Sequence, residues 1–341
     1  MFPVPRFLEM PAVGIDISDQ SVRFLELLPT RHGLEVGRFG DSPIPPGIVK
    51  SGGIVDEEKL VAILKKIKTD YSFDFIRASL PEERVYLFKT EVPNATMLQT
   101  ETAIAAQLEE NVPLPPNEVV FDYDPIKTET GHVDKIHVSV SVIPAAIVQS
   151  YLALFKNAGL EPLSFEIEAQ AIARSVVPTG DFGTYMIVDF GKTRTGLSIK
   201  SQGVIRYTST LDLGGSSLNN ALQKTLSLSP EEAEKLKREK GLIKTADNKA
   251  VFDALINPIS VLRDEINRHY IYWQGAKDKG GVNEEKIQKI ILCGGDANLI
   301  GLIDYLTSTI RVPVEVANVW TNVLSFDHAV PEIQFSDSLR Y

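Results

Sequence analysis

Cysteine and histidine are scarce in this 341-residue chain, and their scarcity excludes two kinds of site. A single cysteine, Cys293, rules out an internal disulfide framework and fits a reducing compartment. Cys293 lies in an apolar, strand-like run, which indicates a packed core residue rather than a reactive one. The five histidines are scattered without the spacing of metal ligands, so we expect no protein-held zinc site; they are His32, His132, His137, His269 and His328.

Long apolar runs and an excess of positive charge are also missing. No segment approaches the roughly 20 apolar residues that a membrane span needs, and the apolar run at the N-terminus is too short for a signal peptide. The net charge of -10 argues against nucleic-acid binding, because contact with duplex phosphates needs a basic face. With 43% hydrophobic and 23% charged residues, the chain has the composition of a globular protein long enough for two domains.

The stretch YMIVDFGKTRTGLSIK, residues 185–200, has the pattern of a strand, a turn and a second strand. Its first apolar run ends in Asp189, the chain turns through Gly191 to Arg194, and a strand restarts at Thr195. Such a turn presents backbone N–H groups, a hydroxyl and a carboxylate, a combination that suits a phosphate. An Asp and a Gly at a strand end are also common in ordinary hairpins, so this pattern alone leaves both interpretations open.

A second copy of the pattern, VGIDISDQSVRFLEL at residues 13–27, favours the phosphate interpretation. Two such hairpins facing one polyphosphate would bring two carboxylates close to it. Carboxylates repel phosphate unless a cation lies between them, which predicts hydrated Mg²⁺ held through water by Asp16 and Asp189. A third glycine turn, CGGDANLIGL, precedes a helix. There Gly294 and Gly295, which lack side chains, would let the face of a base lie against the backbone.

The remaining sequence predicts strands and helices in an α/β order. Residues 82–162 have the pattern of a small αβ module inserted into the first half, and residues 178–183 are a predicted hinge. The predicted strands are 12–18, 22–28, 34–40, 75–80, 85–92, 136–142 and 204–211. The predicted helices are 56–69 capped by Asp56, one capped near Asn94, 144–158, 166–177, 230–240 capped by Ser229, and a longer helix opened by Pro258.

The motifs GIDIS…VRFLEL, VDFGKTRTGLSI, AEKLKREKG and CGGDANLIGL, in this order, resemble the actin-like ATPase superfamily. Within it, NVPLPPNEVVFDY and the C-terminal ANVW…PEIQFSDSLRY are similar to the PilM family of type IV pilus assembly proteins, relatives of FtsA. The resemblance implies an α/β, actin-like fold: a duplicated, ribonuclease H-like two-domain ATPase fold with an inserted small αβ subdomain. The implied parts are a first domain (1–81, 163–181 and 313–341), the insertion (82–162), a second domain (182–222 and 286–312) and its subdomain (223–285).

The resemblance also implies a role for each matching residue. Glu168 would position the attacking water and, with Asp189, make up the catalytic pair. Arg23 stands where the family usually has a phosphate-facing lysine. The implied cofactor-binding residues are Asp16, Ser18, Asp19, Gln20 and Arg23 in the first loop, Gly191, Lys192, Thr193 and Thr195 in the second, Gly214 and Gly215 before a helix, and Glu234, Lys237, Gly294, Gly295 and Asp296 at the ribose and the adenosine.

Several of these residues have a structural alternative. Arg23 could be a solvated strand residue, Glu168 a helix N-terminal acid favoured by the helix dipole, and Glu234 with Lys237 an exposed ion pair.

The first loop departs from the family pattern G-I-D-I-G-T. Ser18 and Asp19 replace the glycine and the threonine; the serine restricts the backbone, and the aspartate adds negative charge beside the terminal phosphate. Lys192 and Arg194 in the second loop would compensate in part. We therefore expect nucleotide binding more than hydrolysis. Family members typically continue past Tyr341 into a small-residue helix, which implies a truncated chain or a surface supplied by a partner.

The function implied by the resemblance is a cytoplasmic scaffold that binds ATP and Mg²⁺ and reaches the inner membrane only through partners. The partner that the resemblance implies is the N-terminal cytoplasmic tail of PilN, which would lie in a groove partly walled by residues 82–162. Other pilus platform proteins and further copies of the chain stay open as partners. Two alternatives are a small-molecule kinase, for which the insertion shows no catalytic base, and an FtsA-like filament, which should carry a C-terminal amphipathic helix.

Overall fold

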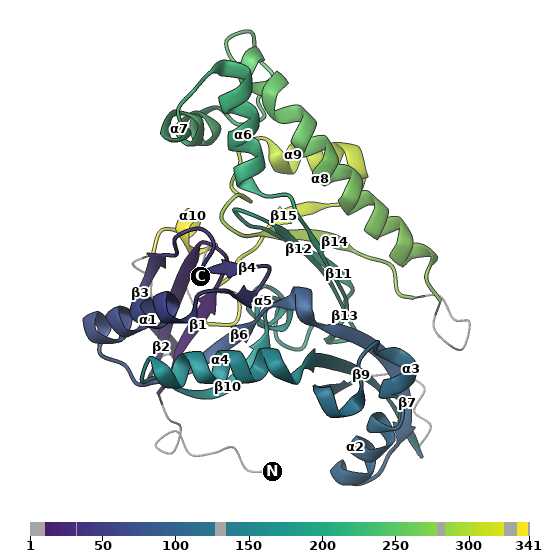
Figure 1. Ribbon diagram of the computed structural model, residues 1–341. Coiled ribbons are helices and arrows are strands. Elements are labelled where there is room, and N and C mark those ends of the chain that lie inside the picture. The colour runs from purple at the N-terminus through teal and green to yellow at the C-terminus, as the bar shows by residue number, and fades with distance from the viewer. Residues whose placement is uncertain (1–10, 32, 127–133, 278–283, 324–332, 340–341) are drawn as a thin grey trace. The chain divides into compact units, whose positions relative to one another are not determined.

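The computed structural model describes residues 11–31, 33–126, 134–277, 284–323 and 333–339. The chain forms two compact units. The first contains residues 1–175, 320–334 and 341, and the second contains residues 176–319 and 335–340. Each unit is built on one five-stranded sheet (Figure 1).

The two large sheets have the same strand order, which confirms the predicted duplicated α/β fold. In each, the first three strands form an antiparallel meander, and the fourth and fifth strands add in parallel beside the first. The first sheet has β1 (Val13–Ile17), β2 (Ser21–Thr30), β3 (Gly33–Pro43), β6 (Phe75–Leu80) and β10 (Glu161–Ile167). The second has β11 (Tyr185–Phe190), β12 (Thr195–Ser201), β13 (Val204–Leu211), β14 (Lys289–Cys293) and β15 (Val314–Val316).

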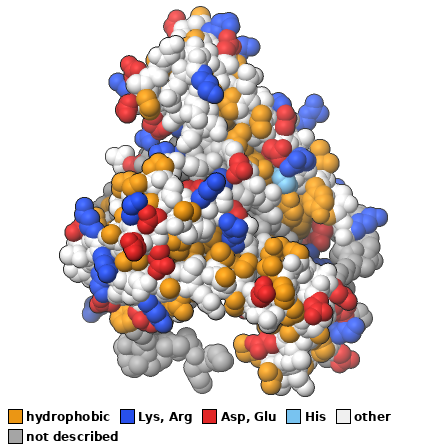
Figure 2. Space-filling view, in the orientation of Figure 1, with side chains coloured by type: hydrophobic (Ala, Val, Ile, Leu, Met, Phe, Trp, Pro, Cys, Tyr) orange, Lys and Arg blue, Asp and Glu red, His pale blue; other side chains and the backbone are white. Residues whose placement is uncertain are grey.

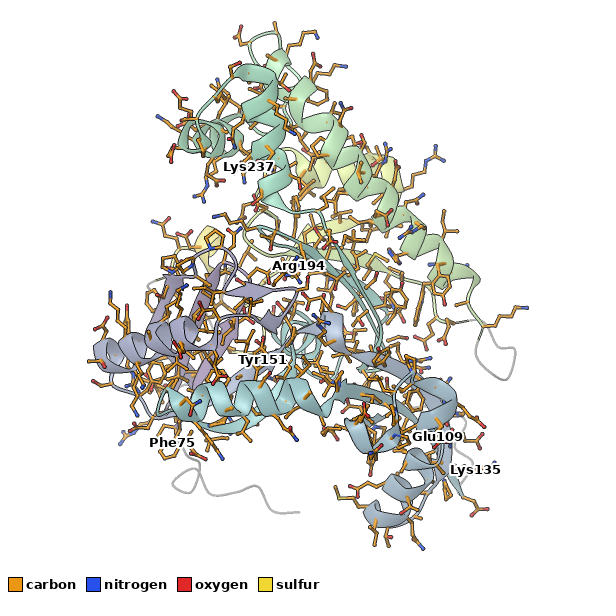
Figure 3. All side chains as sticks on the ribbon, viewed as in Figure 1. Phe75, Glu109, Lys135, Tyr151, Arg194 and Lys237 are labelled. Carbon is orange, nitrogen blue, oxygen red and sulfur yellow. The ribbon has the colours of Figure 1, made fainter. Side chains whose placement is uncertain are left out.

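Helices α1 (Glu57–Tyr71) and α4 (Ala145–Asn157) share one hydrophobic core with the first sheet. Asp56 begins α1 as predicted, since its side chain accepts the backbone N–H of Lys59 at 3.1 Å. Tyr151 of α4, which Figure 3 labels, is 1% exposed in this core. The predicted insertion of residues 82–162 is therefore drawn too wide, because α4 packs with the first sheet.

The insertion itself has a separate small core. Its sheet has the order β7 (Tyr86–Pro93), β9 (Lys135–Pro144), β8 (Val119–Pro125), and it carries α2 (Met97–Ala105) and α3 (Leu108–Asn111). Helix α2 begins after Thr96, close to the predicted cap near Asn94, and Thr96 forms a capping box with Gln99. All of these elements lie between residues 86 and 144. The inserted module, defined by its separate core, therefore spans these residues.

The second unit carries the helices α6 (Gly215–Leu226), α7 (Pro230–Lys240), α8 (Lys249–Gly275) and α9 (Leu302–Ile310). Helix α7 has the predicted cap, with Ser229 and Glu232 in a capping box. The predicted start of α8 at Pro258 is wrong, because α8 runs through this proline. The loss of one backbone hydrogen bond there is offset by the buried face of Ile259, Leu262 and Ile266.

The short elements complete the structure. They are β4 (Val49–Lys50), β5 (Gly53–Ile54), the 3-10 helices Glu82–Arg84 and Pro116–Glu118, α5 (Glu168–Val176) and α10 (Phe335–Ser338). Residues 313–319 belong to the second unit, since β15 pairs with β14, whereas the sequence placed them in the first domain. Over the described residues, no helix has the length and apolar character to cross a membrane. On the face in Figure 2, acidic and basic side chains are interspersed.

One buried ion pair fastens the edge of the first sheet to α1. Glu26 on β2 has a side chain only 5% exposed, and it forms a two-pronged pair with Arg38 on β3. Arg38 also donates to the carbonyl oxygens of Tyr71, at 3.0 Å, and Ser72, at 2.6 Å, where α1 ends. The Arg38 hydrogen bonds hold the pKa of the Glu26 carboxyl below its ordinary value, against the effect of burial.

Replacing this arginine tests the role of the pair. We expect Arg38→Met to lower the free energy of unfolding by about 2 kcal/mol, because Glu26 is left buried and charged. This loss is smaller than for a fully buried ion pair, since the Arg38 side chain is 39% exposed. Urea denaturation measures the change. Arg31→Met, at an exposed arginine, is the control and should change the free energy by less than about 0.5 kcal/mol. Equal losses in both variants would contradict the assignment.

Candidate functional site

The predicted carboxylate of the first hairpin, Asp16, lies in a row of polar side chains across the first sheet. Strand pairing places Arg23 of β2 opposite Asp16, and Asp41 of β3 opposite Arg23. On the other side, the Ser79 hydroxyl of β6 donates to Asp16 Oδ1. Arg23 Nε is buried without a hydrogen-bond partner, so this atom does not fit the alternative of a solvated strand residue. Asp16 therefore accepts a hydrogen bond from β6 and has Arg23 opposite it on β2.

The turn after Asp16 is closed by the side chain of Ser18. Its hydroxyl oxygen accepts the backbone N–H groups of Gln20, at 3.4 Å, and Ser21, at 3.1 Å. The Ser18 N–H donates to the Ser21 carbonyl oxygen at 2.9 Å. Asp19 Oδ2 lies 3.4 Å from the backbone nitrogen of Ser51, which donates to it. Two of the turn amides that sequence analysis assigned to phosphate are thus engaged by this serine.

Three predicted site carboxylates gather around one buried phenol. Burial raises the pKa of Tyr151, and the charges of Asp16, Glu168 and Asp19 raise it further. The Tyr151 hydroxyl donates to the carbonyl oxygen of Gly52 at 3.1 Å. Glu168 reaches this neighbourhood because α5 begins directly where β10 ends. Asp16, Asp19 and Glu168 therefore lie near enough to Tyr151 for their charges to raise its pKa, and sequence analysis treated Tyr151 only as part of a helix.

The second hairpin turn is bonded to the start of α6. The backbone N–H of Gly215 donates to the Gly191 carbonyl oxygen at 3.0 Å, and that of Ser216 donates to the Lys192 carbonyl oxygen at 2.8 Å. A Cβ on Gly214 would lie 2.7 Å from the Gly191 carbonyl oxygen, so only glycine allows this approach. The predicted Gly191, Lys192, Gly214 and Gly215 thus form one assembly. Thr193 lies in the same turn.

Thr195 does not fit its predicted role as a cofactor ligand. The residue is 0% exposed, and its hydroxyl donates to the Leu213 carbonyl oxygen at 2.6 Å. This bond ties the start of β12 to the segment before α6. The hydroxyl is used inside the unit because the residue is buried and its proton needs an acceptor there.

The glycine at position 294 is explained by Asp189. Gly294 has φ +87, and a Cβ there would lie 2.3 Å from Asp189 Oδ1 and 2.6 Å from the Phe190 carbonyl oxygen. Glycine is needed at position 294 because a side chain would collide with the predicted carboxylate, Asp189. The sequence predicted a different reason, the stacking of a base against the backbone. Gly295 follows directly and Cys293, which is 4% exposed, precedes it as the predicted core residue.

Three predicted residues of the adenosine set meet in a buried ionic cluster. Lys237, labelled in Figure 3, is 3% exposed, and its Nζ lies 2.5 Å from Asp296 Oδ1 and 3.0 Å from Glu234 Oε2. The alternative of an exposed pair on a solvated helix is therefore wrong for this lysine. Asp296 also lies against the start of α6, since a Cβ on Gly215 would be 1.9 Å from its Oδ2.

Asn219 is a member of this cluster that sequence analysis missed. Its amide donates to Glu234 Oε2 at 2.7 Å, while Arg238 Nε donates to Glu234 Oε1 at 2.6 Å. Burial opposes ionisation of Glu234, but the hydrogen bonds from Asn219, Arg238 and Lys237 outweigh it and lower the pKa of this carboxyl to about 2. No motif in the sequence singles out Asn219. It is a polar residue next to Leu218, which the fold buries.

The predicted site residues thus fall into two sets, one on each unit. Asp16, Ser18, Asp19, Gln20, Arg23 and Glu168 belong to the first unit, and the rest, Asp189 among them, belong to the second. Within the described parts of the chain, no group of three or more His, Cys, Asp or Glu side chains could hold a metal ion. The water-mediated Mg²⁺ at Asp16 and Asp189 stays a prediction.

Comparisons with known proteins agree with this architecture. The family model of the type IV pilus assembly protein PilM matches residues 14–338. A structure of a PilM-PilN type IV pilus biogenesis complex is similar over 97% of this chain and 94% of that chain, with TM-score 0.75 and 21% identity. The ethanolamine utilization protein EutJ from Carboxydothermus hydrogenoformans (94% and 89% covered, TM-score 0.56, 15% identity) and ADP-bound MreB5 of Spiroplasma citri (91% and 92%, 0.55, 14%) share the fold.

Two lysines on α7 offer a matched test of the ionic cluster. We expect Lys237→Met to lower the free energy of unfolding by about 3 kcal/mol, because Asp296 and Glu234 lose their buried counter-charge. Lys235→Met is the control, since the Lys235 side chain is 75% exposed, and it should cost less than about 0.5 kcal/mol. Denaturant titration of the two variants measures the difference. Similar stabilities would show that the cluster contributes little.

Proposed function

The chain belongs to the family of the type IV pilus assembly protein PilM, and from this premise we propose that it is an actin-like scaffold of the pilus assembly platform. In this proposal it works in the cytoplasm, binds the N-terminal tail of PilN and holds ATP with Mg²⁺. The structure of a PilM-PilN complex supports PilN as a partner. The structures of MreB5 bound to ADP and to AMPPNP support the binding of an adenine nucleotide.

The observation that carries the nucleotide proposal is the assembly on the second unit. The β11–β12 turn, the start of α6, helix α7 and the segment after β14 meet through hydrogen bonds and close approaches, although they are far apart in the sequence. These segments supply cations at Lys192 and Arg194 for phosphates, and the ionised Glu234 for ribose hydroxyls. This donor set fits a nucleotide. Mg²⁺, when bound, would neutralise phosphate charge next to Asp189.

Hydrolysis has weaker support than binding. Glu168 and Asp189, the predicted catalytic pair, belong to different units, so neither unit by itself holds both side chains. Thr195 is used inside the second unit. A scaffold can use a nucleotide only to stabilise one conformation, and for this the nucleotide must bind but need not be hydrolysed. We therefore propose that the nucleotide has a structural role in this chain.

The PilN proposal rests on the inserted module. Two side chains of α2, Met97 at 70% and Leu98 at 73%, are strongly exposed, and Val120 of β8 is 47% exposed. Both α2 side chains follow directly on the helix N-cap Thr96. Exposed apolar side chains on a small module suit an extended tail with apolar residues. In this proposal the module supplies one wall of the PilN site.

Calorimetry of ATP with and without Mg²⁺ tests the nucleotide proposal. We expect Mg²⁺ to strengthen ATP binding to the wild-type chain, and Asp189→Asn to reduce this strengthening about tenfold, because the amide cannot attract the hydrated cation. The amide also keeps the shape that Gly294 accommodates. Asp212→Asn, at an exposed aspartate, is the control and should behave like wild type. No ATP binding, or an unchanged Mg²⁺ effect in Asp189→Asn, would overturn the proposal.

Fluorescence anisotropy with a labelled N-terminal tail peptide of PilN tests the partner proposal. Met97→Ser combined with Leu98→Ser should weaken binding at least about tenfold, since two apolar contacts are lost. The matched control is Val261→Ser with Ile271→Ser on α8, where the side chains are 52% and 60% exposed on the second unit. If the control weakens binding and the α2 variant does not, the tail contacts the second unit instead.

A further inference from the structure

Helix α8 runs along one side of the second unit in Figure 1 and has a buried face and an exposed face. Ile259, Leu262, Ile266 and Trp273 lie on the buried face. The exposed face carries a line of residues, the α8 stripe, at intervals of 4, 3, 4, 3 and 4 positions: Asn257, Val261, Asp264, Arg268, Ile271 and Gly275. These intervals keep the stripe on one side of the helix, and paired helices contact each other at the same spacing.

The α8 stripe combines exposed aliphatic side chains with exposed charges. Val261 is 52% exposed and Ile271 is 60% exposed, and Tyr272, next to the stripe, is 62% exposed. Between the two aliphatic residues, the side chains of Asp264 and Arg268 are 67% and 65% exposed. The second unit therefore presents a narrow surface with one acid and one base at its centre and an aliphatic residue on each side of them.

The α8 stripe is symmetric about the level of residue 266. Residues at equal distances from this level are Asp264 and Arg268, Val261 and Ile271, and Asn257 and Gly275. Two α8 helices laid antiparallel, with a two-fold axis at this level, would place acid opposite base and aliphatic opposite aliphatic residue. A parallel pair would instead place like charges opposite each other, and these repel. The stripe is thus complementary to a second copy of itself, as an isologous interface must be.

We propose that the α8 stripe is a contact surface between two copies of this chain, which pair through antiparallel α8 helices about a two-fold axis. The net charge of -10 makes two copies repel each other, whereas the centre of the stripe carries balanced charges that attract. Asp264 already lies 2.7 Å from Arg263 of its own helix, and Arg268 pairs with Glu265. In the dimer, these two local pairs join into one network across the axis.

The length of the stripe sets the strength of the contact. From residue 257 to residue 275 the helix extends about 27 Å. One pair of helices of this length buries less than the roughly 1,200–2,000 Å² of a stable interface, and exposed ion pairs each contribute little. We therefore expect a dissociation constant on the order of 10 µM. The dimer goes beyond the proposed scaffold function and depends neither on a nucleotide nor on PilN.

Exchange of the two central charges tests the pairing. Sedimentation velocity of the full chain at about 5 to 100 µM, in low salt, should show a monomer–dimer equilibrium for wild type. Asp264→Arg and Arg268→Asp should each raise the dissociation constant at least about tenfold, because like charges then face each other. An equimolar mixture of the two variants should dimerise again, since every arginine faces an aspartate. A residue that only stabilised its own helix would not be rescued by mixing.

Disulfide cross-linking tests the orientation of the helices. The native Cys293 is buried and does not interfere. A mixture of Val261→Cys and Ile271→Cys chains should form a cross-linked dimer under mild oxidation, because these positions face each other. Each variant alone should not, since two copies of one position lie about 15 Å apart along an antiparallel pair, too far for a disulfide.

Four results would overturn the inference. They are a wild-type chain that is monomeric at about 100 µM, a dimer that the charge variants leave unchanged, a mixture of charge variants that stays monomeric, and cross-linking of Val261→Cys to itself as readily as to Ile271→Cys. If the chain is monomeric and the tail peptide of PilN protects Val261→Cys from alkylation, the α8 stripe binds PilN instead of a second copy.

Discussion

A carboxylate at the end of a buried strand costs free energy unless its neighbours neutralise or hydrogen-bond it, and this constraint applies once in each unit. In the first unit, Asp16 receives the hydroxyl of Ser79 and lies opposite Arg23. In the second, Asp189 lies opposite Gly196 on β12 and against Gly294, whose missing Cβ makes room for it. The two sheets repeat one topology but surround the repeated acid with different groups, so the two halves are not equivalent toward a ligand.

Local patterns predicted the meanders and the capped helices, because their determinants lie within a few residues. Asp56, Ser229 and the two hairpins are at the predicted places. Prediction failed where the partner is distant. Residues 161–167 form β10 only because β6 pairs with them, and the helix expected from residue 166 begins at Glu168. The helix predicted to begin at Pro258 begins at Lys249, because a short-range rule does not include the packing of α8.

The site shows the same division between what is local and what is distant. The resemblance assigned Lys237 and Asp296 to one site, and the two side chains lie 2.5 Å apart. It could not find what their atoms do. The buried hydroxyl of Thr195, the amides engaged by Ser18 and the amide of Asn219 on Glu234 depend on side-chain geometry in the folded chain. Residue type therefore predicted location here, whereas hydrogen bonding decides which residues are still able to contact a ligand.

Binding and hydrolysis make different demands on this chain. The residues that the resemblance assigns to the nucleoside and to the second phosphate loop all belong to the second unit, so the proposed nucleotide contacts depend on that unit's own structure. The proposed catalytic pair does not share a unit, since Glu168 belongs to the first and Asp189 to the second. Hydrolysis would need both side chains at one water molecule, a demand that binding alone does not make. A scaffold that uses its nucleotide for stability therefore asks less of these residues than an ATPase does.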